Sequence, residues 1–398
     1  MDITIHPGKL NGIIRAIASK SQAHRLLICA AFSGSVTELI CENTNDDIEA
    51  TASCLRALGA AIQRTRMGYI VSPIVEIPEH AQIDCSESGS TLRFLLPVVC
   101  ALGIRTTIHM HGRLPYRPLS PLWEELERMG CRLSRPTETA IQTSGKLRPG
   151  DYTIAGNVSS QFISGLLFAL PLIDGESRIH ITGNLESKPY VDMTQQALRK
   201  FGVETDRFVL KKSYPFSSPG RLSVEGDWSN AAFFLVANAL GSDIRMDNLN
   251  FNSPQGDRAI AEILSTDTPM PVIDASNIPD LVPILAVYYA ATCGAVFENI
   301  ARLRIKESDR VQSVLNLLHT FGIHAFADDN TLTVNGGRLS GGVVNSCNDH
   351  RIAMASAIAA TVADGPVTIL GAECVAKSYP VFWQDFRMLG GCYEQYIR

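Results

Sequence analysis

One pattern recurs six times along the chain and constrains its fold more than any other feature. A small polar or acidic residue opens a nearly uninterrupted apolar run that is rich in alanine. These runs start at Ser21, Ser90, Ser160, Ser229, Asp280 and Asp349. Each run is apolar on all sides, which predicts a buried helix, and each opens on a residue type that caps helix N-termini. The starts are 69, 70, 69, 51 and 69 residues apart, which favours a true repeat over chance recurrence of α/β patterning.

Each apolar run is followed by a β-prone segment and then by an amphipathic stretch. Five of the amphipathic stretches end in a glycine that suits a helix C-terminus, namely Gly59, Gly130, Gly202, Gly322 and Gly390. Pro97 and Pro171 lie inside or late in two apolar runs and are expected to kink or end those helices. Because 398 residues are too many for one ordinary core, the six units predict two domains of three units each.

Composition and charge exclude several classes of protein. Hydrophobic residues make up 45% of the chain and charged residues 19%, which is typical of a folded protein. The net charge of −5 argues against a protein that coats nucleic acid or an anionic membrane. The sequence shows no membrane-spanning run, no signal or transit layout at its start, and no CxxC pair or zinc-like cluster among its ten cysteines. We therefore expect a cytoplasmic protein with no structural metal and no disulfide framework.

Charged and small polar residues gather where the buried helices are expected to begin. The unpaired N–H groups and positive dipole end of a helix bind phosphate and carboxylate groups, and arginine adds a two-pronged donor for the same anions. Eight cations lie beside the predicted termini: Lys20, Arg25, Arg93, Arg117, Lys306, Arg310, Arg351 and Lys377. Any one of them alone is most simply a solvated surface charge. Their joint placement predicts two anion-binding surfaces, one in each domain.

Common nucleotide-binding and hydrolase motifs do not account for these cations. Residues 371–378 nearly match the phosphate-loop pattern GxxxxGK[ST], but Ala376 replaces the glycine that brings the backbone close to phosphate. No GxGxxG follows a predicted strand, and GxSxG is absent. The sequence therefore predicts neither a dinucleotide cofactor nor an α/β-hydrolase nucleophile.

Ten short motifs, in order along nearly the whole chain, resemble those of the 5-enolpyruvylshikimate-3-phosphate synthase family. They are SKS at 19–21 with Arg25, SGSTLR at 88–93, RP at 117–118, SSQ at 159–161, SKPY at 187–190, VEGD at 224–227, IPD at 278–280, KESDR at 306–310, DHR at 349–351 and KSYP at 377–380. No single motif is specific, but their joint order is.

This resemblance implies an α/β fold of a particular kind. It is a two-domain inside-out α/β barrel with three βαβαββ units per domain, in which helices are buried and sheets face outward. One domain is expected to be discontinuous and to contain residues 1–12 and 225–398, and the other to contain residues 13–224. The active site is expected in the cleft between them. Since the two helix-end surfaces carry like charge, we expect anionic substrates to draw the domains together.

The resemblance also implies a reaction and its partners. The enolpyruvyl group of phosphoenolpyruvate is transferred to the 5-hydroxyl of shikimate 3-phosphate, and phosphate is released, on the route to chorismate and the aromatic amino acids. The hydroxyl adds to the enol carbon while the methylene carbon is protonated, and the tetrahedral intermediate then loses phosphate. This chemistry needs no metal or redox cofactor. The expected partners are these two small molecules, with no nucleic acid or membrane, and the protein is expected to be a monomer.

The implied site residues carry over motif by motif. Shikimate 3-phosphate is expected at Lys20, Ser21, Arg25, Ser159, Ser160, Gln161, Ser187, Tyr190, Asp280 and Lys306. Phosphoenolpyruvate is expected at Lys20, Gly89, Arg117, Gln161, Arg310, Arg351 and Lys377. A side chain at Gly89 would crowd a substrate that lies against the backbone.

The implied catalytic residues are Asp280, Lys306, Glu307 and Lys20. Asp280 is the candidate base for the 5-hydroxyl, with Lys306 beside it, and Glu307 is the candidate for proton transfer at the methylene carbon. The simpler role for Glu307 is a salt bridge to a neighbouring arginine.

Three positions depart from the family pattern. Ser90 and Phe94 stand where threonine and proline are common, and Arg302 stands where some members have an asparagine near the shikimate ring. The nearest alternative function is enolpyruvyl transfer to UDP-N-acetylglucosamine. That sister enzyme starts with SKN and usually has a cysteine before its RP motif, whereas HGRLPYRP at 111–118 has none. A non-catalytic anion-binding scaffold is a further alternative, against which the candidate catalytic residues argue.

Overall fold

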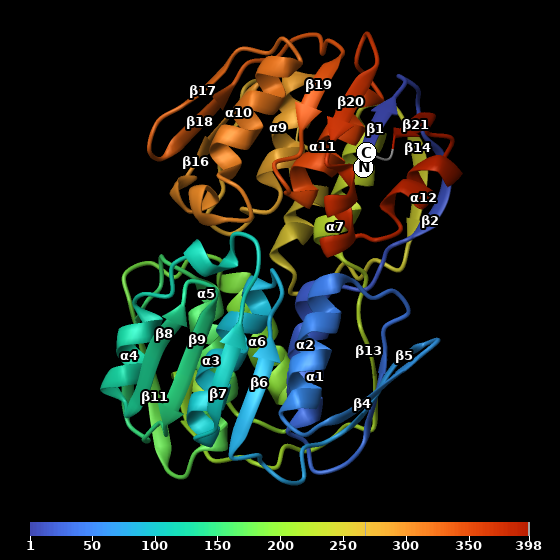
Figure 1. The fold of residues 1–398 in the computed structure, drawn as a ribbon. Helices are drawn as coiled ribbons and strands as arrows, with labels where there is room; N and C mark the ends of the chain where they lie inside the picture. The colour runs from blue at the N-terminus through green and yellow to red at the C-terminus, as the bar shows by residue number, and fades with distance from the viewer. Residues whose placement is uncertain (267, 397–398) are drawn as a thin grey trace. The chain divides into compact units, whose positions relative to one another are not determined.

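The computed structural model describes residues 1–266 and 268–396, and Figure 1 shows its fold. The chain divides into two compact units, each with its own hydrophobic core. We call residues 18–225 the central unit, and residues 1–17 with 226–398 the terminal unit. The expected boundaries fall after residues 12 and 224, whereas the units divide after residues 17 and 225. Residues 267, 397 and 398 of the expected discontinuous domain lie outside the described residues.

All six apolar runs form helices, as predicted. They are α1 (Lys20–Ala31), α3 (Gly89–Leu102) and α5 (Ser160–Ala169) in the central unit, and α7 (Trp228–Ala239), α9 (Val282–Ala290) and α11 (His350–Ala360) in the terminal unit. Most of their side chains are buried, and their apolar side chains belong to the core of the unit that holds them. These helices are therefore core elements rather than surface elements.

The capping residues of these helices correct the prediction. Ser21, Ser90, Ser160 and Ser229 lie inside the first turn, and the caps are Ser19, Ser88, Ser159 and Asp227, one or two positions earlier. Asp349 caps α11 as predicted. Apolar periodicity defines the body of a helix but not its first turn, because polar residues lie on both sides of the cap.

Prolines lie in or next to three of the buried helices, with different effects on each. Pro283 stands in the first turn of α9, where its missing N–H costs nothing. The residue before this helix is Leu281, which makes no side-chain cap. The predicted cap Asp280 therefore lies outside the helix. Pro97 neither ends nor interrupts α3, which continues to Leu102. Pro171 lies in the 3-10 turn Leu170–Leu172 directly after α5, and there the helix does end.

Six amphipathic helices alternate with the buried ones. They are α2 (Asp46–Ala57), α4 (Leu122–Arg128), α6 (Lys188–Lys200), α8 (Ile260–Ile263), α10 (Arg310–Thr320) and α12 (Phe382–Met388). The five predicted terminal glycines all have positive φ angles, between 75° and 115°. This left-handed conformation ends a helix without the steric cost that a side chain would add.

The strands of the described residues form six small sheets, three in each unit; five are mixed, and the two-stranded β14–β2 sheet is parallel. In spatial order, the central unit contains β13 (Arg221–Ser223), β3 (Thr37–Ile40), β5 (Gly68–Ser72) and β4 (Ala61–Thr65); β6 (His80–Asp84), β7 (Arg105–His109), β9 (Ala140–Gly145) and β8 (Cys131–Thr137); and β10 (Asp151–Ala155), β11 (Glu176–Thr182) and β12 (Val209–Lys211). The terminal unit contains β14 (Asp243–Asp247) and β2 (Asn11–Arg15); β15 (Val272–Asp274), β16 (Ala295–Glu298), β18 (Thr331–Val334) and β17 (Ala325–Ala327); and β19 (Gly342–Asn345), β20 (Val367–Leu370), β1 (Asp2–Ile5) and β21 (Tyr393–Tyr396).

Every sheet begins with a parallel pair of strands. In four sheets a buried helix joins the two strands of that pair, as α3 joins β6 to β7. In the other two sheets the paired strands lie far apart in the sequence. Strand β2 precedes α1 but pairs with β14, while β13 precedes α7 but pairs with β3. The chain therefore crosses between the units shortly after β2 and shortly after β13.

The N-terminal strand completes the last sheet of the terminal unit. Strand β1 pairs with β20 on one side and with β21 on the other, so the first and last strands of the described residues are neighbours in one sheet (Figure 1). Among the described residues, no helix combines the length and the apolar character that a membrane crossing requires.

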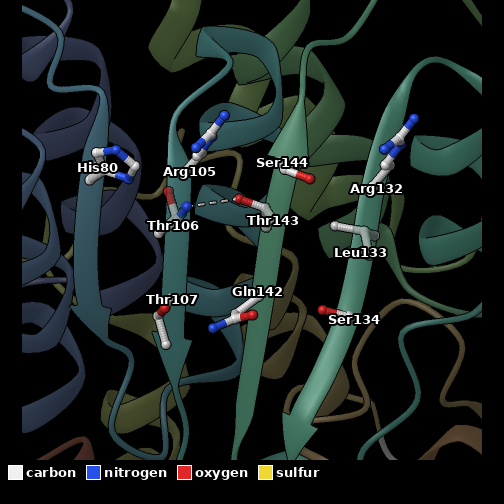
Figure 2. Close-up of a pocket in the computed structure, with 10 residues that line it drawn as sticks. All are labelled: His80, Arg105, Thr106, Thr107, Arg132, Leu133, Ser134, Gln142, Thr143 and Ser144. Carbon is white, nitrogen blue, oxygen red and sulfur yellow. Dashed lines mark hydrogen bonds between the residues drawn. The ribbon is translucent and has the colours of Figure 1, made fainter.

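One sheet of the central unit carries a shallow depression of about 330 Å³ on its outward face. Figure 2 shows that the residues lining it come from all four strands of the β6–β7–β9–β8 sheet, including Arg105 and Arg132. The lining includes none of the predicted site residues. Most of the predicted site residues lie instead at the starts of helices.

Candidate functional site

The predicted site residues fall into two groups, one in each unit. The central cluster contains Lys20, Ser21, Arg25, Gly89, Arg117, Ser159, Ser160, Gln161, Ser187 and Tyr190. The terminal cluster contains Asp280, Lys306, Glu307, Arg310, Arg351 and Lys377. Most of these residues lie at or beside the first turn of a helix, where N–H groups and the helix dipole favour anions.

Arg25 is a buried guanidinium whose hydrogen-bond partners are all neutral. Its side chain is 2% exposed. Nε donates to Thr194 Oγ1 at 2.8 Å, and the terminal nitrogens donate to the carbonyl oxygens of Ser21 at 2.6 Å and Tyr190 at 2.8 Å. Burial lowers the pKa of Arg25 to about 10. Within residues 1–266 and 268–396 no carboxylate pairs with it, so this position favours an anionic ligand.

Lys20 begins α1 and is tied to the neighbouring helix. Its Nζ donates to Asp47 Oδ2 at 3.0 Å, and both side chains are mostly buried. Asp47 lies in the first turn of α2, where a carboxylate also interacts well with the helix dipole. The ion pair therefore fixes the position of the ammonium group at the start of α1.

Two guanidinium groups converge on Gly89. A Cβ atom at this position would lie 2.6 Å from an Nη atom of Arg93 and 2.7 Å from one of Arg117. Arg93 donates to Gln161 Oε1 at 3.1 Å, and Gln161 donates through Nε2 to Ser90 Oγ at 2.9 Å. These bonds bring the first turns of α3 and α5 together. The absence of a side chain at Gly89 thus leaves room for the guanidinium groups of Arg93 and Arg117. The sequence predicts only that a side chain there would crowd a substrate.

The serines of the central cluster occupy two kinds of helix start. Ser159 caps α5, its Oγ accepting from the backbone N–H of Gln161 at 3.3 Å, and Ser160 directly follows it. Ser187 precedes α6 with a φ of 53°, is 2% exposed, and does not cap that helix through its side chain. A non-glycine residue in this conformation costs on the order of 1 kcal/mol and is typical of functional sites.

Asp280 accepts from three cations in the terminal cluster. Its Oδ1 is 2.7 Å from an Nη atom of Arg310 and 3.5 Å from Lys306 Nζ, and its Oδ2 is 2.9 Å from an Nη atom of Arg351. Because α9 begins after Leu281, this carboxylate is not used as a helix cap.

The same contacts set the protonation states of Asp280 and Lys306. Burial raises the pKa of Asp280, but Arg351, Lys306 and Arg310 outweigh burial and hold that pKa well below its usual value. Burial lowers the pKa of Lys306 to about 8, against the attraction of Asp280. Asp280 is therefore ionised at neutral pH, and Lys306 exchanges its proton in a range useful for catalysis.

Arg310 links three carboxylates. It is 1% exposed, and its nitrogens lie 2.7 Å from Asp280, 2.5 Å from Glu307 and 2.8 Å from Asp349. The salt bridge considered for Glu307 is therefore present. Asp349 also caps α11 by accepting from the backbone N–H of Arg351 at 3.0 Å. Each guanidinium nitrogen of Arg310 already has a protein carboxylate as partner.

Lys377 lies near the start of α11. It ends the 3-10 segment Ala372–Lys377, and its Nζ donates to the carbonyl oxygen of Asn348 at 3.0 Å. Asn348 directly precedes the capping residue Asp349. This bond places a fourth ammonium or guanidinium group beside the helix starts of the terminal unit.

Three further residues contact the predicted substrate-binding residues: Arg93, which the sequence predicts only as one of eight cations beside the helix starts, and Asp47 and Asp349, which it does not predict as site residues. Arg93 and Asp349 stand inside motifs that the sequence singles out, so their motif positions could have identified them. Asp47 lies in an acidic first turn, which from sequence indicates only a favourable helix dipole. Its pairing with Lys20 is a tertiary contact that no local pattern predicts.

Nearly the whole chain is similar to known proteins. The family model described as EPSP synthase (3-phosphoshikimate 1-carboxyvinyltransferase) matches residues 5–386. A 3-phosphoshikimate 1-carboxyvinyltransferase from Clostridium kluyveri is 40% identical over 417 residues, covering 98% of this chain and 97% of the relative. The corresponding protein of Clostridium acetobutylicum is 41% identical over 416 residues, with the same coverage of 98% and 97%.

A solved structure shows the same fold. EPSP synthase from Acinetobacter baumannii matches with a TM-score of 0.81 at 24% identity, covering 99% of both chains. The family model spans nearly the whole chain, and both curated relatives match over almost their full length. On these matches, the chain belongs to the EPSP synthase (3-phosphoshikimate 1-carboxyvinyltransferase) family.

Proposed function

We propose that this chain performs the reaction of its family with a division of labour between its two clusters. The reaction transfers the enolpyruvyl group of phosphoenolpyruvate to the 5-hydroxyl of shikimate 3-phosphate, a step in the synthesis of chorismate and the aromatic amino acids. The central cluster binds anionic groups of both substrates, while the terminal cluster moves the protons and also contributes cations to substrate binding. Both clusters act on the same pair of substrate molecules.

The observation that carries this proposal is the buried Arg25 guanidinium with only neutral hydrogen-bond partners. A buried cation is costly without an opposite charge, so the site is complete only with a bound anion. The phosphate of shikimate 3-phosphate supplies that charge. The other members of the shikimate 3-phosphate set are Lys20, Ser21, Ser159, Ser160, Gln161, Ser187 and Tyr190 of the central unit, with Asp280 and Lys306 of the terminal unit.

Phosphoenolpyruvate is assigned to the other cations. Arg117 and the space above Gly89 receive one of its anionic groups, because two guanidinium groups already converge there. Lys20 and Gln161 border the same helix starts. Arg310, Arg351 and Lys377 of the terminal unit complete the phosphoenolpyruvate set.

Proton transfer is assigned to the terminal cluster. The substrate 5-hydroxyl donates to Asp280 and its proton passes to the Asp280–Lys306 pair as its oxygen bonds to the enol carbon, while Glu307 gives a proton to the methylene carbon. In the second step that carbon returns a proton to Glu307, the bond to the phosphate oxygen breaks, and phosphate leaves with the proton that the Asp280–Lys306 pair took from the hydroxyl. A group with a pKa of about 8, such as Lys306, is well matched to such transfers near neutral pH.

The finer features of the fold belong to the same proposal. Each unit is a domain of the inside-out α/β type, supported by six buried helices and by strands that alternate buried with exposed side chains. The active site combines residues of both domains. The protein works as a monomer in the cytoplasm, and it requires no metal or redox cofactor.

A phosphate-release assay with two acceptors tests the function. The enzyme is incubated with phosphoenolpyruvate and either shikimate 3-phosphate or UDP-N-acetylglucosamine. We expect release with shikimate 3-phosphate alone. Release with only the UDP-sugar would assign the chain to the sister reaction, and binding of both anions without release in either mixture would make it a non-catalytic scaffold.

A further inference from the structure

A chain of buried hydrogen bonds crosses three helices of the central unit. His24 on α1 contacts Thr51 on α2, with Nδ1 and Oγ1 2.6 Å apart. The Thr51 hydroxyl is 2.6 Å from the hydroxyl of Thr91 on α3, which donates to Ser88 Oγ at 2.8 Å. All four side chains are fully buried. None of them belongs to the substrate-binding residues proposed above.

The direction in which these hydrogen bonds run follows from the single proton that each hydroxyl group can donate. The Thr91 hydroxyl has one proton, and its acceptors are Ser88 Oγ and, at 3.5 Å, the carbonyl oxygen of Asp47. Thr91 therefore has no proton for Thr51, so Thr51 donates to Thr91. Thr51 must then accept from His24, which requires a proton on His24 Nδ1.

The other ring nitrogen indicates that His24 is neutral. His24 Nε2 is buried, and it has no hydrogen-bond partner within the described part of the chain. A second proton there would leave a buried donor unsatisfied, at a considerable cost. Burial, together with the nearby charges of Lys20 and Arg25, also lowers the pKa of His24 well below its usual value. The ring is thus the neutral tautomer with its proton on Nδ1.

The series of hydrogen bonds that begins at His24 ends at the start of α3. Ser88 caps this helix, its Oγ also accepting from the backbone N–H of Thr91 at 3.3 Å. Gly89, where Arg93 and Arg117 converge, is the first residue of the helix. The hydrogen bonds therefore tie His24 on α1 to the turn that carries the proposed phosphoenolpyruvate position.

We propose that His24 is a positioning residue for phosphoenolpyruvate binding, in which a neutral imidazole protonated at Nδ1 orients Thr51 and Thr91 and so fixes the first turn of α3. This inference rests on the proposed function of the central cluster. An apolar side chain would fill the space beside Phe94 at a lower desolvation cost. The directed hydrogen bond is what a histidine adds there.

Nitrogen NMR of the native enzyme tests the protonation state directly. The protein is labelled with 15N in its histidine side chains, and the His24 signals are assigned by their loss in a His24→Asn variant. We expect one protonated nitrogen at Nδ1 and a bare Nε2, unchanged between pH 6 and 8. Protonation at Nε2 instead, or a titration within this range, would overturn the proposal without bearing on the overall reaction.

Matched variants test the positioning role. Thr51→Val keeps the shape of the side chain but breaks the chain, so we expect the KM for phosphoenolpyruvate to rise about fivefold, as for one lost hydrogen bond. Thr51→Ser keeps the hydroxyl and should stay near wild type. His24→Asn places an amide N–H near the position of Nδ1 and should restore binding that His24→Leu loses. The KM for shikimate 3-phosphate should change less than about twofold in all four variants.

A control variant separates positioning from simple loss of stability. Thr106 on β7 is also buried and donates to the carbonyl oxygen of Ile104 at 3.3 Å, outside the His24 chain. Thr106→Val should lower the melting temperature and leave both KM values unchanged. If Thr51→Val behaves like this control, or raises both KM values equally, the positioning role is wrong. Wild-type turnover, measured first, tests the proposed function separately.

Discussion

At the scale of single residues, the two clusters handle buried charge in opposite ways. Arg25 is surrounded by neutral oxygens, so its charge is left for a ligand. Arg310 is held by three carboxylates, so, besides its proposed role in phosphoenolpyruvate binding, its charge orients Asp280 and Glu307. Buried cations of the first kind favour anion binding, and those of the second kind organise acid–base groups.

The lowered pKa of Lys306 predicts that kcat/KM falls at alkaline pH. Its pKa of about 8 means that the ammonium charge is present below that pH and is lost above it. We expect kcat/KM for either anionic substrate to fall above a pH of about 8. The phosphate groups of the substrates do not produce this limb, because their second pKa is about 6. Lys306→Arg keeps its charge and should shift the limb upward by more than one pH unit, and an unchanged limb would assign it to another group.

Asp280 predicts a separation of binding from turnover. Asp280→Asn keeps the shape of the side chain and removes the charge that orients the substrate hydroxyl and Lys306. We expect turnover to fall by about 100-fold or more, while calorimetry still detects binding of shikimate 3-phosphate. Turnover within about tenfold of wild type in a correctly folded variant would remove Asp280 from the mechanism.

Gly89 predicts a defect selective for one substrate. In Gly89→Ala the new Cβ meets Arg93 and Arg117 at less than 3 Å, so the guanidinium groups must move apart. We expect the KM for phosphoenolpyruvate to rise about tenfold, equivalent to about 1.4 kcal/mol, with little change for shikimate 3-phosphate. Gly8→Ala is the matched control, because its Cβ would meet nothing within 4 Å. Equal kinetics of the two variants would contradict this account of Gly89.

At the scale of elements, the sequence allows the six buried helices and the five terminal glycines to be predicted, because both depend on local patterns. It does not allow the caps to be predicted, since Ser19 and Ser21 are both suitable residue types and only the tertiary contacts at the helix start distinguish them. The candidate site divides in the same way. Motif positions identify Asp280, but its contacts with Arg310 and Arg351 join three helix starts that lie far apart in the sequence.

The cap of α2 provides a prediction at this scale. Asn45 Oδ1 accepts from the backbone N–H of Ile48 at 3.0 Å. Asn45→Ala should lower the free energy of unfolding by about 1 kcal/mol, while Asn45→Ser keeps a capping oxygen and should lose only a few tenths of that. Denaturant titration of the two variants measures the difference. If they are equally stable, the side-chain cap does not support α2.

At the scale of the whole molecule, two long-range strand pairs define the domain organisation. Strand β2 belongs to the terminal unit although it precedes α1, and β13 belongs to the central unit although it precedes α7. Local patterns place both segments in a repeat but do not reveal the partner strand, because strand pairing is non-local. The terminal unit therefore needs β2, from before the first chain crossing, to complete one of its sheets, whereas the central unit pairs its own first and last strands, β3 and β13.

The proposed action of both units on the same substrates predicts compaction on binding. Small-angle X-ray scattering should show a smaller radius of gyration when shikimate 3-phosphate and phosphoenolpyruvate are both present, because the anions neutralise the positive helix starts of the two units. UDP-N-acetylglucosamine with phosphoenolpyruvate is the control mixture. A radius of gyration that stays the same with saturating substrates would contradict closure.

The most direct test of the central claim is the fate of the methylene hydrogens during turnover in heavy water. Addition and elimination at the enol carbon turn the methylene group into a methyl group and back again. The account predicts that the enolpyruvyl product made from shikimate 3-phosphate and phosphoenolpyruvate in heavy water carries deuterium at its methylene carbon, detected by mass spectrometry. A product whose methylene carbon remains free of deuterium would contradict the account.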